Sequence, residues 1–378
     1  MGGRQPALVG VDIGGTKIKA GAVAVGPDGA ARHVAAADRI PTPAAAPGPF
    51  YDAVASLIRQ VQTRAADAGC AVLPIVAVAH PGRFLPDGRL ARGTTPNLGT
   101  SPNQFDGLSP AQELERRLPV RVFACNDAVA QMRFGLEVVL RDPTLRPALV
   151  GQTVVYLGPG TGMGGGVALV SQDGAVEPTT DGHFFDLQVV AYGDGTLTAE
   201  ELLTGPAIAR AVAQANTGLT APIQPPRAGG LDELLRSPTA RPEHRACAQQ
   251  IAGEFGERLA GLIETIARGT IRKVRVERAA DGALIRRVDE PDRAWSAADQ
   301  ALVRGCRRFL LGGFVGSSAG LGASIRDQAL ARLRRRGLPE VQIIQVPLDS
   351  DDAGLLGAVR AVPVSELAGR LSAGWCGG

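Results

Sequence analysis

Two glycine-rich segments, each preceded by a run of apolar residues, have the composition of phosphate-binding turns. Residues 8–16 read LVGVDIGGT, and residues 154–166 read VVYLGPGTGMGGG, with six glycines among the nine positions 158–166. Glycine loses more backbone entropy on ordering than any other residue, so this density needs a reason. A turn without Cβ atoms lets backbone N–H groups converge on an anion. We therefore interpret both segments as phosphate-binding turns, although either one alone would also fit a plain hairpin.

Three phosphate-binding arrangements compete for these segments. The Walker motif needs a lysine directly after Gly15, where the chain has Thr16, so this motif is excluded. Gly160, Gly162 and Gly165 match the dinucleotide-binding GxGxxG pattern, which requires a helix directly after the glycines. Here VALVSQDG follows and predicts a strand that ends in a turn, which argues against a nicotinamide dehydrogenase. Two glycine hairpins in two similar α/β halves satisfy the third arrangement.

Two aspartates lie at the carboxyl ends of predicted strands. Asp12 ends the strand before the first glycine turn, and Asp127 ends a strand at 119–127 and begins a helix. Open α/β sheets bind their ligands at this edge. Asp12 has the hard oxygen ligands that Mg²⁺ prefers, and Asp127 is placed to accept a proton. The simpler interpretations are a turn former for Asp12 and a helix N-cap for the Asn126–Asp127 pair.

The elements that must position these residues occur twice in the same order. The first set has strands at 7–15, 17–25, 72–80 and 119–127 and helices at 50–68 and 127–140. After Pro143 and Pro147 a strand, a glycine turn and a returning strand recur at 153–170. The second set is completed by helices at 247–268, about 321–336 and 349–362, a strand leading into RFLLGGFVGSS (308–318) and a strand at 341–348. We predict two α/β domains, 1–128 and 129–378, facing each other across a cleft.

A charged segment at 271–300 interrupts the second domain. It alternates charged and apolar residues around an Asp-Gly turn, so we expect a solvated hairpin. Trp295 within it would pack either on a partner or on the cleft, and the sequence does not decide between these. The basic cluster at 332–336, followed by Gly337 and Pro339, is typical of a solvated helix C-terminus.

Bulk composition narrows the class of protein. The 378 residues are 45% apolar and 20% charged, which is typical of a globular protein. The net charge of +3 is too small to indicate binding to nucleic acid or to an anionic membrane. Five scattered cysteines without a CxxC pair indicate reduced thiols. The N-terminal residues contain no apolar stretch long enough for a signal peptide or a membrane span. We expect a cytoplasmic protein that has no nucleic-acid or membrane partner.

Six segments, in order, resemble those of the ROK family of sugar kinases and repressors. They are LVGVDIGGTKIKAG (8–21), PNLG (96–99), CNDAVAQMRFGL (125–136), GPGTGMGGGV (158–167), LLGGFVGSS (310–318) and DDAGLLGAV (351–359). The resemblance spans about 8–361. It implies the actin/hexokinase-like (ribonuclease H-like) fold, with an ATP cleft between duplicated α/β domains, and ATP and Mg²⁺ as cofactors. The family is also commonly dimeric, so we expect a homodimer.

The resemblance also implies roles for individual residues. Asp127 would be the catalytic base, and Asp12 would face Mg²⁺ through water. The nucleotide would lie against the glycine turns and the strand end at 312–313, with these residues: Asp12, Gly14, Gly15, Thr16, Lys17, Gly160, Thr161, Gly162, Gly312 and Gly313. The acceptor would contact Asn97, Asn126, Asp127, His183 and Glu200, with Glu201 as an alternative to Glu200.

The chain departs from the family pattern at two places. Family members often carry a structural zinc site of one histidine and three cysteines, but no cysteine follows His183 until Cys247, so we predict no zinc. Thr180 occupies the position of a family glutamate that grips hexose hydroxyls, and Asp181 lies one step later. The acceptor is therefore expected to differ from glucose.

Several functions remain open on this basis. The first is an ATP- and Mg²⁺-dependent kinase of a small sugar or sugar-like polyol, with a cyclitol or pseudosugar of secondary metabolism as the alternative acceptor. A sugar- or nucleotide-sensing protein without catalysis is the alternative of another class. A ROK repressor would need an N-terminal helix-turn-helix, and the first phosphate motif begins at residue 8, so we expect no such module.

Overall fold

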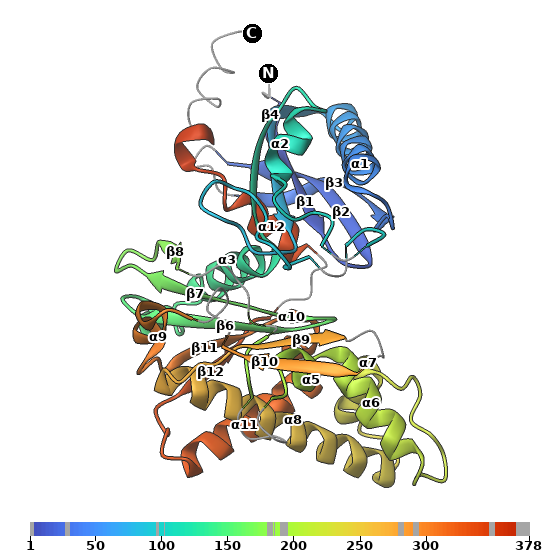
Figure 1. Ribbon diagram of the computed structural model, residues 1–378, viewed down its shortest axis with the longest axis vertical. Helices are drawn as coiled ribbons and strands as arrows, with labels where there is room; N and C mark the ends of the chain where they lie inside the picture. The colour runs from blue at the N-terminus through green and yellow to red at the C-terminus, as the bar shows by residue number, and fades with distance from the viewer. Residues whose placement is uncertain are drawn as a thin grey trace. The chain divides into compact units, whose positions relative to one another are not determined.

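The computed structural model describes residues 4–26, 31–95, 98–101, 103–179, 184, 186–189, 196–278, 283–289, 295–347 and 352–367. The chain divides into two compact units, residues 1–134 with 350–378, and residues 135–349. We expected a boundary at 128–129 with the C-terminal helix in the second domain. In the structure that helix lies in the first unit, and the boundary falls inside a helix (Figure 1).

The first unit is built on a five-stranded sheet in the order β3-β2-β1-β4-β5. Its elements are β1 (Gln5–Ile13), β2 (Lys17–Val25), β3 (Ala31–Pro41), α1 (Pro47–Asp67), β4 (Cys70–His80), α2 (Pro110–Glu115), β5 (Arg121–Asn126), the start of α3 (Asp127–Leu140), and α12 (Ala353–Val359). β1, β4 and β5 run parallel to one another, and β2 and β3 are antiparallel to their neighbours.

The second unit repeats this sheet. The order β8-β7-β6-β11-β12 matches the first sheet strand for strand, including the antiparallel hairpin around the glycine turn. Its elements are α4 (Arg146–Leu149), β6 (Thr153–Pro159), β7 (Met163–Val170), β8 (Val176–Pro178), α5 (Ala199–Leu203), α6 (Gly205–Asn216), α7 (Ala228–Arg236), α8 (Pro242–Arg268), β9 (Val274–Arg278), β10 (Leu284–Val288), α9 (Ala297–Val303), β11 (Arg308–Leu311), α10 (Gly313–Gly316), α11 (Leu321–Arg335) and β12 (Gln342–Gln345). The predicted duplication of an α/β unit is confirmed.

Helices cover both faces of the first sheet. α1 places Phe50, Tyr51 and Val54 against one face, in a cluster with alternate residues of β1. α12 places Leu355 and Ala358 against the other face. The periodicity of the sequence does not show that α12 belongs to the first unit. Its place follows from the second face of the first sheet, which α12 covers.

The start of α12 differs from the sequence-based expectation. We expected the aspartates at 349–352 to cap this helix, but Asp352 makes no capping hydrogen bond and instead forms an ion pair with Lys19, with Nζ and Oδ1 2.5 Å apart. β3 was not predicted, because its alternation of small and charged residues gives a weak strand signal. Among the described residues, no helix is both long and apolar enough to cross a membrane.

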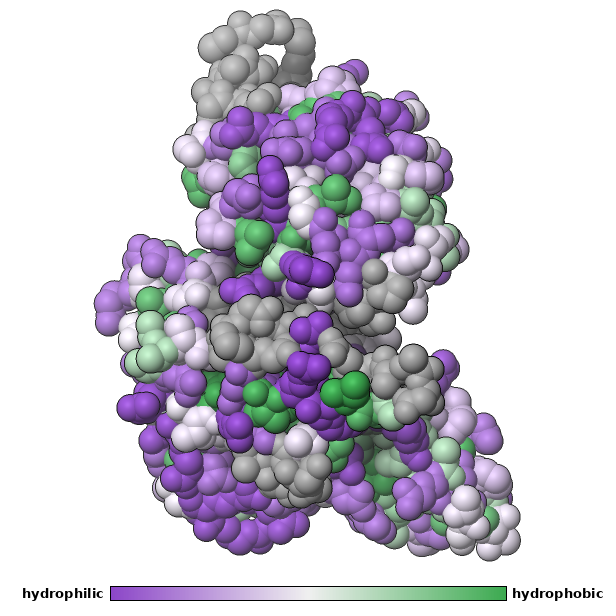
Figure 2. All heavy atoms as spheres, viewed as in Figure 1, coloured by the Kyte–Doolittle hydropathy of each residue, from purple (hydrophilic) through white to green (hydrophobic). Residues whose placement is uncertain are grey.

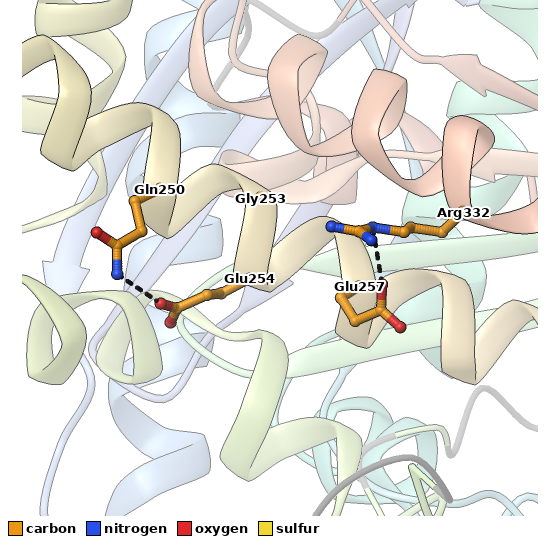
Figure 3. Close-up of a pocket in the computed structure, with 5 residues that line it drawn as sticks. All are labelled: Gln250, Gly253, Glu254, Glu257 and Arg332. Carbon is orange, nitrogen blue, oxygen red and sulfur yellow. Dashed lines mark hydrogen bonds and ion pairs between the residues drawn. The ribbon is translucent and has the colours of Figure 1, made fainter.

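The visible surface of each unit is mostly hydrophilic, with apolar residues scattered among charged ones (Figure 2). A groove of about 540 Å³ lies on the second unit between α8 and α11, lined by Gln250, Gly253, Glu254, Glu257 and Arg332 (Figure 3). Arg332 Nε lies 2.8 Å from Glu257 Oε2, and the Gln250 amide donates to Glu254. At the C-terminal end of α11, Arg334 and Arg335 are exposed, as expected for a solvated helix end, whereas Arg332 and Arg336 form ion pairs with Glu257 of α8.

Candidate functional site

The carboxyl edge of the first sheet brings Asp12 and Asp127 into one region. Asp12 pairs with Ala79 on β4, and Ala79 pairs with Cys125 on β5, two residues before Asp127. Neighbouring strands lie about 4.8 Å apart, so the backbones of Asp12 and Cys125 are roughly 10 Å from each other, and Asp127 follows two residues after Cys125. The sequence-based expectation that both carboxylates share one edge of a parallel sheet agrees with this register.

Asp127 begins α3, and its carboxylate is held at the start of that helix. Its Oδ1 accepts the Ala128 N–H at 2.9 Å. Burial raises the pKa of Asp127 to about 6, although hydrogen bonds from the Ala128 and Asp127 amides and from Asn126 oppose the shift. A carboxylate with a pKa in this range is a stronger base than an exposed aspartate and is still ionised at neutral pH.

Asn126 caps α3. Its buried side chain accepts from the Ala128 and Val129 amides at 2.9 and 3.1 Å, and its Nδ2 donates to the Gly82 carbonyl at 2.9 Å. The N-cap interpretation therefore holds for Asn126, and a role in substrate binding stays a prediction. These bonds fix the peptide that carries Asp127 to the turn after β4.

A buried histidine that sequence reasoning missed lies next to this cap. His80 is fully buried, and its register partner on β5 is Asn126. Its Nδ1 lies 2.6 Å from the Pro81 carbonyl and so carries the proton, which leaves Nε2 to accept from the Tyr51 hydroxyl at 3.1 Å. Burial lowers the pKa of His80 to about 4, so the ring is neutral at physiological pH. One indication of this place was present in the sequence, because His80 is the last residue of the strand predicted at 72–80.

Asp12 lies against the first turn of α12. A Cβ on Gly354 would come closer than 3.0 Å to the carboxylate of Asp12, so only glycine permits this approach. The Lys19–Asp352 ion pair lies in the same region, since Lys19 is the register partner of Asp12 on β2. The contact accounts for Gly354, the first of the two glycines in the DDAGLLGAV segment, which the sequence alone did not show.

The first glycine turn joins β1 to β2. Gly14 N–H donates to the Lys17 carbonyl at 2.9 Å, and the Gly14 carbonyl accepts from the Thr42 hydroxyl at 2.6 Å. Gly15, Thr16 and Lys17 are exposed. No atom of the chain lies within 4 Å of the place a Gly15 Cβ would take, so internal packing does not account for this glycine.

The second glycine turn, between β6 and β7, is closed by its own backbone. Gly160 N–H donates to the Gly162 carbonyl at 2.9 Å, and the Gly160 carbonyl accepts from Gly205 N–H at 2.7 Å. Thr161 and Gly162 are exposed at its tip. β7 begins at Met163, so a strand follows the glycines as predicted, and the dinucleotide-binding arrangement is excluded.

Gly312 and Gly313 lie beside this turn, and the buried Tyr156 connects them to it. The ring of Tyr156 is so close to Gly158 and Gly312 that a Cβ on either would come within 3.0 Å of it. The Tyr156 hydroxyl accepts Gly313 N–H at 3.1 Å, and Gly313 has φ +65°. The two predicted nucleotide-binding segments of the second unit are thus adjacent. Tyr156 was not predicted, because an apolar strand residue gives no signal of such a role.

The structure separates the roles of Glu200 and Glu201. Glu200 Oε2 accepts Met163 N–H of the glycine turn at 2.5 Å, and burial raises the pKa of Glu200. Glu201 forms the capping box of α5 with Thr198 and a two-bond ion pair with Arg286. Glu200 is therefore the carboxylate beside the glycine turn, whereas both oxygens of Glu201 are occupied.

Some predicted site residues lie outside the described residues. Asn97, His183, Thr180 and Asp181 belong to this group, as does the Asp-Gly turn of the 271–300 segment. The described residues contain no group of three or more His, Cys, Asp or Glu side chains that would hold a metal ion. Because His183 is not among them, the absence of a zinc site stays a prediction.

The raised pKa of Asp127 predicts how activity depends on pH. If Asp127 acts as a base, its proton must be absent, so kcat/KM should fall about tenfold per pH unit below about 6 and level off above it. Initial rates between pH 5 and pH 8 would measure this. A carboxyl with the ordinary pKa of 3.8 would leave the rates flat over this range and would contradict the assignment. Circular dichroism at each pH is the control, because His80 is buried neutral and stability should decline as pH falls from 6.5 toward about 4.

Comparisons with known proteins support the fold and the family. Residues 8–175 match the sequence profile of the ROK family. A search of curated proteins by sequence gave no match. Among solved structures, a ROK hexokinase from Thermus thermophilus is 21% identical with a TM-score of 0.55, covering 96% of this chain and 99% of that one.

Two further solved structures represent the two functional branches that the resemblance suggested. A ROK family glucokinase from Streptomyces griseus, in complex with glucose and AMPPNP, is 21% identical with a TM-score of 0.57, covering 94% of this chain and 98% of that one. A ROK family transcriptional regulator, a homologue of the E. coli MLC protein, is 13% identical with a TM-score of 0.59, covering 94% of this chain and 78% of that one. Residues 8–175 thus resemble the ROK family in sequence, and over nearly its whole length the chain has the two-unit α/β fold of solved ROK sugar kinases.

Proposed function

We propose that this protein is an ATP- and Mg²⁺-dependent kinase that transfers the γ-phosphoryl group to a hydroxyl of a small sugar or sugar-like polyol. The observation that carries the proposal is the carboxyl edge of the first sheet. There a metal-suited carboxylate, Asp12, and a half-buried carboxylate of raised pKa, Asp127, lie two strands apart beside a glycine turn. A sensor would need the phosphate turns but not a carboxylate with the pKa of a base.

Asp127 would act as the general base. Phosphoryl transfer needs little covalent help, but the acceptor hydroxyl must be aligned and must lose its proton. Asp127 would accept that proton on its carboxylate, and the Asn126 cap and the Ala128 N–H hold this carboxylate at the helix start. The proton would leave as the acceptor oxygen bonds to phosphorus and the bond to the ADP oxygen breaks.

The residues present fit Mg·ATP. The exposed Gly15 and Thr161 mark turn tips that internal packing does not fill, and Asp12 supplies a hard oxygen beside the first turn. Asp12 would hold Mg²⁺ through water, and Gly312 and Gly313 would border the nucleoside. When bound, Mg²⁺ would neutralise phosphate charge.

Glu200 is our first choice for an acceptor contact in the second unit. It carries a partly buried carboxylate beside the glycine turn, and a carboxylate of this kind accepts hydrogen bonds from sugar hydroxyls. Asn97, Asn126 and His183 remain candidates for further acceptor contacts. Because Thr180 replaces a family glutamate, a cyclitol or another acceptor unlike glucose is included in the proposal.

The test is ADP release from Mg·ATP with a panel of hexoses, N-acetylhexosamines and cyclitols. We expect one chemical class to give turnover, together with only slow ATP hydrolysis when no acceptor is present. Calorimetry with a non-hydrolysable ATP analogue would run alongside. ATP binding with no turnover across the panel would replace the kinase with a sensor, and failure to bind ATP would refute both.

A further inference from the structure

The described residues of the 271–300 segment are bonded to the second unit, whereas its charges predicted a solvated hairpin. β9 and β10 pair in antiparallel register, as predicted. β9 is also joined to the chain at 186–188, because Val274 N–H donates to the Asp186 carbonyl at 2.8 Å and Gln188 N–H donates to the Arg272 carbonyl at 2.9 Å. The hairpin is therefore a two-stranded sheet joined to the chain at 186–188, where Leu187 and Lys273 form one antiparallel bridge.

Side chains strengthen this junction on both sides. Lys273 and Asp186 form an ion pair at 3.3 Å, and both are nearly buried, with 8% and 5% of their side chains exposed. Trp295 packs edge-on against Phe184, with ring centroids 5.6 Å apart. Phe184 in turn lies against Gly165 of β7, where a Cβ would come within 3.0 Å of its ring. Trp295 thus packs on its own unit, behind the strand that leaves the glycine turn.

A second connection runs from the hairpin to the start of α5. Arg286 of β10 donates to Glu201 through two nitrogens, Nη1 to Oε2 at 2.9 Å and Nη2 to Oε1 at 2.6 Å, and Nη1 also donates to the Thr196 carbonyl at 2.9 Å. Although burial opposes it, the hydrogen bonds from Arg286 and Thr198 lower the pKa of Glu201. Arg286 is 19% and Glu201 31% exposed, so the pair is partly shielded from solvent.

The residue next to Glu201 is the one that touches the glycine turn. Glu200 lies in the first turn of α5, and its carboxylate accepts Met163 N–H. The Thr204 hydroxyl donates to the Glu200 backbone carbonyl at 2.8 Å. α5 has only five residues, so it cannot hold its own direction against thermal motion. Its orientation is set by contacts with the rest of the unit. Ala199, Leu202 and Leu203 are buried in the apolar core, and Ala199 N–H donates to the Leu187 carbonyl. The capping box and the Arg286 pair add the polar contacts of Glu201, the neighbour of Glu200.

We propose that Arg286, carried by the β9–β10 hairpin, is a positioning residue that orients α5 through Glu201 and thereby places the Glu200 carboxylate against the glycine turn for acceptor binding. The link from Arg286 to Glu200 stands on the geometry of the second unit, and the effect on the acceptor rests on the proposed function.

The test separates the ion pair from the helix cap. Glu201→Gln keeps the capping box, since glutamine serves at that position, but removes the charge that Arg286 pairs with. Arg286→Ala removes the other partner of the ion pair. Arg286→Lys keeps the positive charge but cannot form the two-nitrogen contact with the carboxylate. Arg334→Ala on α11 is a matched control, because it removes an exposed arginine elsewhere in the unit.

The first measurement is amide hydrogen exchange without any substrate. We expect the amides of Met163 and of the first turn of α5 to exchange faster in Arg286→Ala and in Glu201→Gln, with α8 unchanged and the Arg334→Ala control like the native protein. Unchanged exchange at Met163 and α5 would overturn the link from Arg286 to Glu200, whatever the protein phosphorylates.

The second measurement uses the acceptor found in the panel. We expect KM for that acceptor to rise roughly tenfold to a hundredfold in both variants, to recover partly in Arg286→Lys, and to rise no further in the double variant, because the two residues act as one unit. A lower melting temperature with an unchanged acceptor KM would show a structural role only and would overturn the positioning role. Absence of turnover in the native protein would count against the kinase, and the exchange data would still decide the link to Glu200.

Discussion

Asp127→Asn is expected to lower kcat by about 10²- to 10⁴-fold while leaving ATP binding intact, because general-base assistance contributes an effect of that size. The substitution is nearly isosteric. An asparagine oxygen can still accept the Ala128 N–H, and the Asn126 cap does not involve the replaced atoms. The loss would therefore report the missing base and not a displaced helix. Single-turnover rates and calorimetry with an ATP analogue would measure the two quantities separately.

The pKa of Asp127 supplies an internal control for this variant. Folding raises the pKa of the Asp127 carboxyl from 3.8 to about 6, which means that the folded state disfavours its ionised form. The free energy of unfolding therefore decreases as pH rises from about 4 to about 6. Asparagine carries no such penalty, and the variant should be at least as stable as the native protein at neutral pH. An inactive but more stable variant would identify a functional carboxylate. A variant with near-native kcat would refute the assignment of Asp127 as the base.

Gly357→Ala is expected to give the largest loss of stability. Gly357 of α12 faces α3, and a Cβ there would come within 3.0 Å of the carbonyl and Cα of Ala130. These are backbone atoms, which cannot move aside as a side chain can. Overpacking costs about 1–3 kcal/mol or more, against a helix-propensity gain of about 1 kcal/mol for replacing glycine. Because the added Cβ would lie far closer to the Ala130 carbonyl oxygen than van der Waals contact allows, we expect a cost at the upper end of this range and a net loss of about 2 kcal/mol, measured as a lower urea midpoint.

Gly354→Ala is the matched comparison on the same helix. Its Cβ would meet the Asp12 carboxylate, the end of a side chain that can rotate. We therefore expect a smaller loss of stability, but a higher Mg²⁺ concentration for half-maximal activity because Asp12 is displaced. If Gly357→Ala unfolded at the native midpoint, the close contact of α12 with α3 would be wrong. If Gly354→Ala kept a native Mg²⁺ requirement, Asp12 would not serve the metal.

The sequence by itself determined the family resemblance, the duplicated α/β pattern and the two glycine turns. These features are local in the chain: a strand, a turn without Cβ atoms and a returning strand are contiguous at 8–25 and at 153–170. The shared edge of Asp12 and Asp127 was also predictable, because parallel strands bring their carboxyl ends together whatever the side chains do.

Other features were decided by tertiary structure, because they join segments far apart in the chain. α12 lies against the first sheet since its apolar face covers a sheet face that would otherwise be exposed. The buried His80, the ring of Tyr156 between two glycines and the Arg286–Glu201 pair depend on distances that no local pattern records. The alternating charges of the 271–300 segment predicted a solvated hairpin, whereas Lys273 and Arg286 form ion pairs with Asp186 and Glu201, which lie more than 80 residues earlier in the chain. Residues that pair across long stretches of chain leave no periodic pattern in the sequence. Only the folded structure shows which of them are in contact.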